Sequence, residues 1–206
     1  MHEEPSRRER KKEETRHRIF HAAIDLFRER GFERTTIDDI TEKADVAKGT
    51  FFNYFPRKEA VLGYLSEERL MAIEENAPAL FAEDRNAREK LIGVYLMAAS
   101  AYEEDQELAR YVLVELMRRA FGPNEENAYR WHAIIETLLR QGQERGELRS
   151  DLSFERAEAL LTGVYFSTLF QWACCRDGIA RQLHPSFQLQ EELRIRMNLI
   201  MEGLAS

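Results

Sequence analysis

The sequence lacks the features that mark several common classes of protein. No stretch approaches the roughly eighteen uninterrupted apolar residues of a membrane span, and no apolar signal core follows the charged N-terminal residues. The two cysteines, Cys174 and Cys175, are adjacent, which disfavours a bridge between them and gives no metal-ligand spacing. No alternating pattern of strand length appears either. These absences predict an all-α, cytoplasmic protein with no membrane partner.

Sequence motifs of catalysis are missing as well. The chain has no glycine-rich phosphate loop, no H-E-x-x-H, no cysteine and histidine constellation and no nucleophile elbow. The histidines are scattered, and the one pair at i, i+4 spacing, His17 and His21, lies in a charged stretch that makes a weak metal site. We therefore expect no catalytic residue, no metal and no cofactor.

A pair of short helices is predicted within residues 35–58. Apolar residues recur at i, i+3 and i+7 on one face of the first helix: Ile37, Ile40 and Ala44. Thr36 precedes Asp39 by three residues, the spacing at which a hydroxyl and a carboxylate cap each other's backbone donors. Asp45 interrupts this pattern, and a second short helix follows over residues 48–55. Two short helices joined by so tight a turn predict a helix-turn-helix.

The second short helix separates inward from outward residues. Phe51 and Phe55 lie at i and i+4 and should pack inward. The remaining positions lie outward or at the helix start: Lys48, Gly49, Thr50, Phe52, Asn53 and Tyr54. A lysine, an unhindered glycine, a hydroxyl, an amide and exposed aromatics suit phosphates and base edges in a major groove.

Residues 15–62 carry a specific pattern beyond this spacing. A helix ends in Gly31-Phe32, a Thr-Thr pair and an Ile-x-x-Ile follow, and then Ala-x-Val-Ala-Lys-Gly-Thr-Phe-Phe-Asn-Tyr-Phe-Pro-x-Lys-Glu-x-x-Leu. This order resembles the DNA-binding domain of the TetR family of bacterial repressors. The resemblance implies a ligand-responsive repressor that binds a palindromic double-stranded DNA operator as a homodimer and responds to a small-molecule effector of unknown identity.

The resemblance also assigns roles to residues. DNA contact falls to Thr35, Thr36, Lys48, Gly49, Thr50, Phe52, Asn53, Tyr54 and Lys58. Thr35 or Thr36 would anchor a phosphate at the start of the first motif helix, and Tyr54 and Lys58 would hold others. The pattern departs from the family at Asp45, where glycine is common, and at Ala47, where a serine or threonine cap is usual. Phe52 and Asn53 replace the frequent tyrosine and histidine, which changes the expected operator sequence rather than DNA binding itself.

Charge divides the chain into unlike parts. Residues 1–58 carry 14 Lys and Arg against 12 Asp and Glu, whereas the remaining chain carries 16 against 25. We predict a disordered charged arm over residues 1–14, a three-helix helix-turn-helix DNA-binding domain over residues 15–62, and a larger helical effector-binding and dimerisation domain over residues 63–206. In the last of these, a long connecting helix should end at Pro78.

The later helices carry two kinds of apolar side chain. Long stripes on the last two helices are commonly plain core, but the resemblance assigns them to a dimer interface: Tyr165, Leu169, Trp172, Leu189, Leu193, Met197 and Ile200. Large adaptable side chains in the middle helices suit an effector pocket, and the expected lining is Tyr95, Tyr102, Tyr111, Met117, Phe121, Trp131, Phe166 and Phe170. Polar handles for that pocket would be His132, Glu115 or Gln171, although each lining residue taken alone fits ordinary core better than a pocket.

Two other classes of protein stay open at this point. One is an all-helical enzyme, and the other is a protein-binding adaptor in which the helix-turn-helix is only structural. The outward placement expected for Lys48, Gly49, Asn53 and Lys58 argues against the adaptor, because a structural motif has no use for such a surface.

Overall fold

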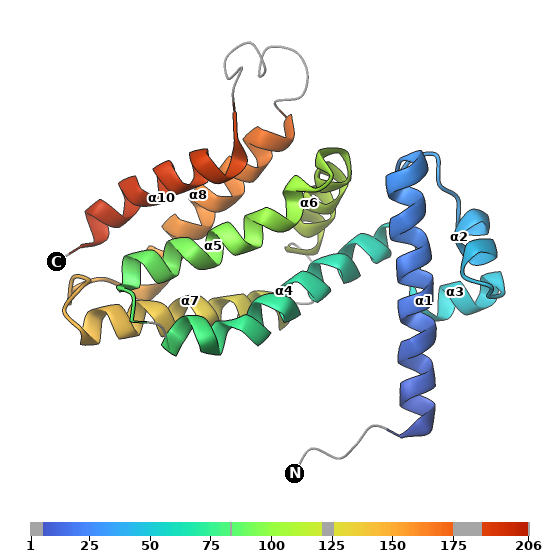
Figure 1. The fold of residues 1–206 in the computed structure, drawn as a ribbon, viewed down its shortest axis with the longest axis horizontal. Helices are drawn as coiled ribbons and strands as arrows, with labels where there is room; N and C mark the ends of the chain where they lie inside the picture. Colours follow the sequence, from blue (N-terminus) through green and yellow to red (C-terminus); the bar gives the residue numbers. More distant parts are fainter. Residues whose placement is uncertain (1–5, 83, 121–125, 175–186, 206) are drawn as a thin grey trace. The chain divides into compact units, whose positions relative to one another are not determined.

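The computed structural model describes residues 6–82, 84–120, 126–174 and 187–205, a part of the chain that is built of α-helices with one isolated bridge between Leu148 and Ala205 (Figure 1). In chain order the helices are α1 (Arg7–Arg30), α2 (Ile37–Lys43), α3 (Lys48–Tyr54), α4 (Glu59–Ala82), α5 (Ala87–Glu103), α6 (Gln106–Ala120), α7 (Glu126–Glu144), α8 (Phe154–Cys174) and α10 (Leu189–Leu204). The all-α prediction is confirmed. Within the described residues no helix combines the length and apolar character needed to cross a membrane.

The chain divides into two compact units, Met1–Ser66 and Glu67–Ser206. Helices α1, α2 and α3 belong to the first unit, and α5 to α10 belong to the second. Helix α4 crosses the division, so its first residues belong to the first unit and the rest to the second.

Helix α1 starts well before the expected position. It begins at Arg7 because Ser6 and Glu9 form a capping box: the Glu9 amide donates to the Ser6 hydroxyl at 3.3 Å and the Ser6 amide to the Glu9 carboxylate at 2.7 Å. In the following turns, His17 lies 3.5 Å from Glu13 at i, i+4 spacing. The expected disordered arm is therefore wrong for residues 7–14, and residues 1–5 lie outside the described part.

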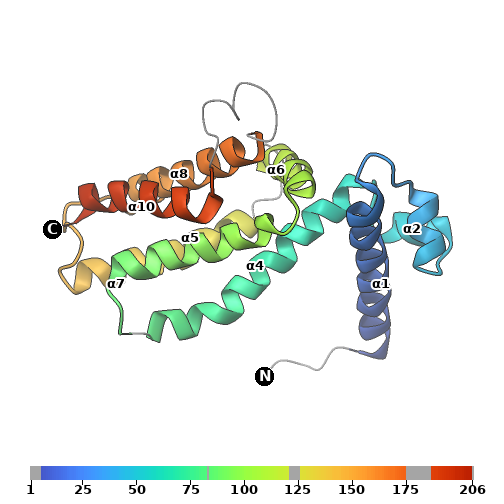
Figure 2. The same ribbon diagram turned by 45° about the horizontal axis from the view of Figure 1, so that its top comes forward.

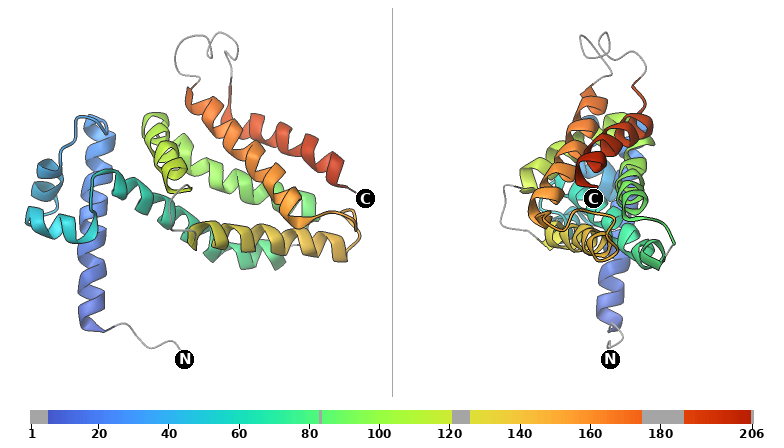
Figure 3. Two further views of the ribbon diagram at one scale, coloured as in Figure 1. Left: turned by 180° about the vertical axis from the view of Figure 1, so that it is seen from behind. Right: turned by 90° about the vertical axis from the view of Figure 1, so that its left-hand side faces the viewer.

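The apolar faces of α1, α2 and α3 close the core of the first unit, and both short helices lie on one side of α1 (Figures 1 and 3). Seven side chains of this core are buried: Ile19, Ala23, Phe27, Phe32, Ile40, Phe51 and Phe55. Two others, Ile37 and Val46, are partly exposed. Ile37 opens α2 and Val46 lies in the turn after it, so neither has a neighbouring helical turn to cover it.

Helix α4 does not end at Pro78 as expected but continues to Ala82. A proline inside a helix removes one backbone hydrogen bond and costs about 3 kcal/mol. Pro78 is on the exposed side, while Ile73 and Ala77 are buried on the other side and hold the helix against the second unit. At its end, the fully buried Lys90 donates from Nζ to the Phe81 carbonyl at 2.8 Å, which satisfies one of the last carbonyls of α4.

The second unit is organised around α10, which packs against both α5 and α8 (Figure 2). Leu193 and Met197 of α10 have no exposed surface. Polar contacts fix the same pairing: Gln190 Nε2 donates to the Leu96 carbonyl at 3.1 Å, and Arg88 Nε donates to Asn198 Oδ1 at 2.9 Å. The last helix therefore forms part of the core of its own chain.

The contact between α7 and α5 requires a glycine. A Cβ atom added at Gly142 would lie 2.6 Å from the Cβ of Ala87 and 2.6 Å from a methyl group of Leu148. Both neighbours are buried, so they have little room to move away.

We predict that Gly142→Ala destabilises the protein by about 1–3 kcal/mol, because an overpacked core must shift backbone or side chains. The matched control is Gly203→Ala, since no atom lies within 4 Å of the added Cβ there and alanine favours a helix by about 1 kcal/mol. Urea unfolding of the two variants and the parent protein measures the difference. Equal midpoints for Gly142→Ala and the parent would contradict the packing argument.

Candidate functional site

The helix-turn-helix starts with a reciprocal cap that the sequence predicts. The Asp39 amide donates to the Thr36 hydroxyl at 3.1 Å, and the Thr36 amide donates to the Asp39 carboxylate at 2.8 Å. The hydrogen bonds from the Thr36 side chain and backbone lower the pKa of Asp39. This capping box starts α2 at Ile37 and fixes the direction in which the chain enters the motif.

The turn between α2 and α3 depends on Asp45. Its φ of 51° lies in the left-handed region, which glycine adopts freely and aspartate tolerates better than most residues. The amide of Val46 donates to the Thr41 carbonyl at 3.0 Å and closes the turn. Aspartate therefore serves where the family commonly has glycine, and it adds an exposed negative charge to the motif.

Helix α3 presents a mixed polar and aromatic surface. Phe51 is buried and its neighbour Phe52 is 46% exposed, while Lys48, Gly49 and Asn53 are also exposed. Thr50 and Tyr54 are half-buried. No atom lies within 4 Å of a Cβ added at Gly49, so the backbone at the start of α3 is open to a partner. The predicted inward and outward faces of this helix are the observed ones.

Thr35 is in the interior rather than at the surface. Its side chain is buried, and its hydroxyl lies 2.9 Å from the Gly31 carbonyl and 3.2 Å from the Leu26 carbonyl. These bonds tie the start of the motif to the end of α1 and use the Thr35 hydroxyl inside the protein. The phosphate contact expected at Thr35 or Thr36 stays a prediction. Thr36 is exposed, but its amide and hydroxyl both bond to Asp39.

Lys58 also has an internal role. Its Nζ donates to the carbonyls of Phe32 at 2.7 Å and Thr35 at 2.9 Å, and it lies 4.3 Å from the centroid of the Phe32 ring. The ammonium group thereby holds the segment that joins α1 to α2. The phosphate contact expected of Lys58 stays a prediction beside this bond network.

Lys48 forms an ion pair that sequence spacing did not reveal. Its Nζ lies 2.7 Å from a carboxylate oxygen of Asp38 in α2, and both side chains are mostly exposed. The contact joins two helices that the turn brings together, so no local sequence pattern predicts it. Asp38 offsets the charge that Lys48 would bring to a phosphate.

The second unit brings several of the expected pocket residues together. The rings of Tyr95 on α5, Trp131 on α7 and Tyr165 on α8 meet with centroid separations of 5.2, 5.4 and 6.2 Å. The Tyr95 hydroxyl is 3.0 Å from the Thr162 hydroxyl, and burial raises the pKa of Tyr95. We call Tyr95, Trp131 and Tyr165, with Tyr102, the aromatic cluster.

Tyr102 joins this cluster to a residue that the sequence analysis missed. Tyr102 is buried, and Tyr165 and Arg69 of α4 are the neighbours that act on its hydroxyl. The guanidinium carbon of Arg69 lies 4.6 Å from the centre of the Tyr102 ring. A signal was available, because Arg69 is four residues before the buried Ile73 and shares its apolar helix face.

The other expected pocket residues lie outside the aromatic cluster as defined above. Phe166 contacts Tyr165 at 5.2 Å between centroids and Phe170 lies farther along α8. Tyr111 is half-buried on α6, Met117 is 47% exposed, and Phe121 lies outside the described residues.

The three expected polar handles have partners of their own. Glu115 accepts two hydrogen bonds from Arg118, and Gln171 accepts one from Arg196 at 2.7 Å. His132 lies between Glu158 and Glu136, and the hydrogen bond to Glu158 raises the pKa of His132. These groups stabilise contacts between and along helices.

The stripes expected at the dimer interface are mostly buried within one chain. Only Ile200 is half-exposed, and the buried members are Tyr165, Leu169, Trp172, Leu189, Leu193 and Met197. They face the core because α8 and α10 pack on each other and on α5 and α6. The exposed apolar side chains of these two helices are different: Leu160 (52%), Ile195 (49%) and Leu199 (63%).

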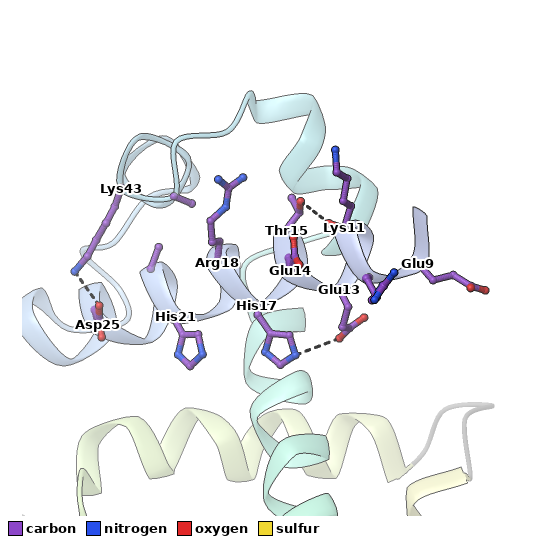
Figure 4. Close-up of a pocket in the computed structure, with 13 residues that line it drawn as sticks. Glu9, Lys11, Glu13, Glu14, Thr15, His17, Arg18, His21, Asp25 and Lys43 are labelled. Carbon is purple, nitrogen blue, oxygen red and sulfur yellow. Dashed lines mark hydrogen bonds and ion pairs between the residues drawn. The ribbon is translucent and has the colours of Figure 1, made fainter. Parts of the chain in front are cut away.

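A groove of about 1270 Å³ runs along α1 (Figure 4). Charged side chains of both signs line it, and His17 is 3.5 Å from Glu13 and 3.4 Å from the Tyr64 hydroxyl. The His17 and His21 rings are stacked at 6.1 Å. Over the described ranges, no three His, Cys, Asp or Glu side chains are placed to hold a metal ion. The groove offers neither an apolar enclosure nor converging ligands.

Comparison with known proteins identifies the family. Residues 19–65 match the model of bacterial regulatory proteins of the tetR family, and residues 67–203 match that of the C-terminal domain of TetR/AcrR family transcriptional repressors. The chain belongs to the TetR family. It is a DNA-binding transcriptional regulator, and the helix-turn-helix and second unit described above are the two parts that the family models cover.

Several relatives of this TetR-family regulator are known. It is 27% identical over 157 residues to the fatty acid metabolism regulator protein of Bacillus subtilis, covering 75% of this chain and 81% of that protein. Among solved structures it is similar to Thermus thermophilus FadR, a TetR-family repressor in complex with lauroyl-CoA, with 32% identity, a TM-score of 0.69 and coverage of 93% and 95%. Bacillus subtilis FadR in complex with stearoyl-CoA shares the fold at 23% identity, a TM-score of 0.68 and coverage of 91% and 98%.

The ion pair between Lys48 and Asp38 leads to a prediction about DNA affinity. Lys48→Ala should weaken binding to all duplexes and reduce the slope of log affinity against log salt by about 1, the value for one phosphate contact. Asp38→Asn should strengthen binding, because it removes the charge that offsets Lys48. Fluorescence anisotropy over a salt series measures both effects, with Asp25→Asn on α1 as the matched control. An unchanged salt slope for Lys48→Ala would refute the role of Lys48.

Proposed function

We propose that this regulator is a cytoplasmic repressor that leaves its palindromic operator when it binds a fatty acyl-CoA. The observation that carries the proposal is the similarity to Thermus thermophilus FadR, whose structure contains lauroyl-CoA, over 93% of this chain at 32% identity. The fatty acid metabolism regulator of Bacillus subtilis supports the same class of effector.

In this proposal the exposed surface of α3 contacts the DNA. Lys48 reaches a phosphate or base, the open backbone at Gly49 approaches the duplex closely, and Asn53 reads an adenine edge. Phe52 touches a thymine methyl group. The half-buried Thr50 and Tyr54, together with the exposed Thr36, complete the contact surface.

Effector binding falls to the second unit. An acyl chain needs apolar walls and a few polar groups to orient its head. The aromatic cluster offers large rings from three helices, α5, α7 and α8, so a ligand that separates these rings also separates the helices. A ligand releases DNA only to the extent that it binds the released conformation more tightly than the DNA-binding one.

Dimerisation falls to the outer faces of α8 and α10. Two recognition helices must reach successive major grooves about 34–36 Å apart, which a paired protein achieves. Leu160, Ile195 and Leu199 are apolar and exposed, and the stripe first expected to pair is used inside the chain. A second copy that covers these three side chains would remove them from water.

The proposed function is tested by DNA selection followed by release. Purified protein is selected against random duplexes at two salt concentrations, and the retained DNA is sequenced. We expect an inverted repeat with half-sites about one helical turn apart. Lauroyl-CoA should then release the labelled operator, whereas CoA alone should not. Recovery of only unpatterned DNA, or of an operator that lauroyl-CoA does not release, would overturn the proposal.

The dimer is tested by placing a charge on its proposed face. Leu199→Arg should raise the dimer dissociation constant by more than about a hundredfold, because an unpaired charge buried in an apolar interface costs several kcal/mol. Val114→Arg is the matched control, since Val114 is 64% exposed on α6 and lies outside that face. Sedimentation measures the association and circular dichroism the fold. A Leu199→Arg protein that stays dimeric would place the interface elsewhere.

A further inference from the structure

Arg69 combines burial with an unsatisfied donor. It lies on α4 and is the third residue of the second unit. The residue is half-buried, but its Nη1 atom is fully buried and has no hydrogen-bond partner within the described chain. Buried polar atoms in folded proteins nearly always have a partner, so an exception calls for an explanation.

The contacts that Arg69 does make use only part of its hydrogen-bonding capacity. Its Nη2 donates to the carbonyl of Ala101, which lies in the last turn of α5 and has no partner within that helix. Its guanidinium lies over the Tyr102 ring, with the guanidinium carbon 4.6 Å from the ring centre. A guanidinium carries five N–H donors, so further acceptors can bind.

The charge of Arg69 is also incompletely neutralised. Among the described residues no carboxylate forms an ion pair with it, and burial lowers the pKa of Arg69 from its ordinary value. An arginine stays protonated in proteins all the same, so this positive charge persists in a poorly solvated place. Carbonyl and ring contacts offset only part of the cost of removing it from water.

We infer that Arg69 is the receptor for the acidic group of the effector, which is an anionic amphiphile with a carboxylate or phosphate head. A guanidinium fits either group through two parallel N–H to oxygen bonds. Tyr102 and Tyr165 add hydroxyls beside it, and the rings of Tyr95 and Trp131 continue from Tyr165 as apolar surface. An acidic head and an apolar tail therefore find matching surfaces in one continuous cluster.

The place of Arg69 in the chain links this site to regulation. An anion on Arg69 acts directly on α4, the helix that continues without interruption into the DNA-binding unit. Binding energy that depends on the position of α4 is the differential affinity that an allosteric ligand requires. This inference rests on the proposed function and specifies which group of the effector is recognised.

The test compares three ligands that share a twelve-carbon acyl chain. Dodecanoate carries a carboxylate, lauroyl-CoA carries phosphates, and the N-acetylcysteamine thioester of dodecanoic acid is neutral. Tryptophan fluorescence reports binding, because Trp131 belongs to the aromatic cluster. Arg69→Gln should lose at least about tenfold in affinity for the anionic ligand that wild type binds, as expected for a hydrogen bond to a charged group, and less than about twofold for the neutral thioester.

The two anionic ligands distinguish the source of the charge. A loss for dodecanoate identifies a carboxylate, and a loss for lauroyl-CoA with no dodecanoate binding identifies a phosphate. Arg69→Lys keeps the charge and should retain part of the preference for the anion. This variant also provides the test if Arg69→Gln does not fold. Arg140→Gln is the matched control, because Arg140 is an exposed arginine of the same unit that pairs with Glu136.

The outcomes separate the inference from the proposed function. Wild-type protein that binds none of the three ligands overturns the proposed acyl effector and the inference with it. A second outcome overturns only the inference: wild type binds, and the Arg69 variants change the affinity for the anionic and the neutral ligand equally, or do not change it at all. In that case Arg69 serves to join α4 to α5, and a lowered melting temperature is its only effect.

Discussion

The continuity of α4 is the constraint on which regulation in this protein depends. The helix begins just after Lys58, whose ammonium group holds the segment before α2, and its Tyr64 hydroxyl donates to Glu13 of α1 at 3.1 Å. Farther along, Glu74 accepts a hydrogen bond from Arg130 at 2.8 Å, and Lys90 holds the last carbonyls. Each unit therefore contacts its own part of one continuous helix.

The two units use polar groups in different ways. In the helix-turn-helix, polar side chains such as Thr35 satisfy backbone groups inside the motif, which leaves the outer residues of α3 available for a partner. In the second unit, Tyr95 and Tyr102 lie in the interior and meet other side chains there. The internal hydrogen bonds of the helix-turn-helix hold that motif rigid, which suits a surface that must match the shape of a DNA duplex. Interior groups that bond to one another can exchange those bonds for bonds to a ligand.

Much of the fold follows from local sequence, and part of it does not. The helix periods, the box formed by Thr36 and Asp39, and the left-handed Asp45 depend on residues a few positions apart, so spacing predicts them. The charged composition of residues 1–14 predicts disorder, whereas the capping box of Ser6 and Glu9 starts α1 at Arg7. The passage of α4 through Pro78 depends on tertiary burial of the opposite face, which outweighs one lost hydrogen bond.

The sequence by itself determined an all-helical chain, a helix-turn-helix and the inward and outward faces of α3. Only the tertiary structure decided what covers each apolar stripe: Leu193 faces its own core, whereas Leu199, six residues later, faces outward. It also decided that Lys58 bonds to internal carbonyls and that Arg69 meets Tyr102. The physical reason is that periodicity specifies which side of a helix is apolar, whereas the partner of that side is set by packing between residues far apart in the chain.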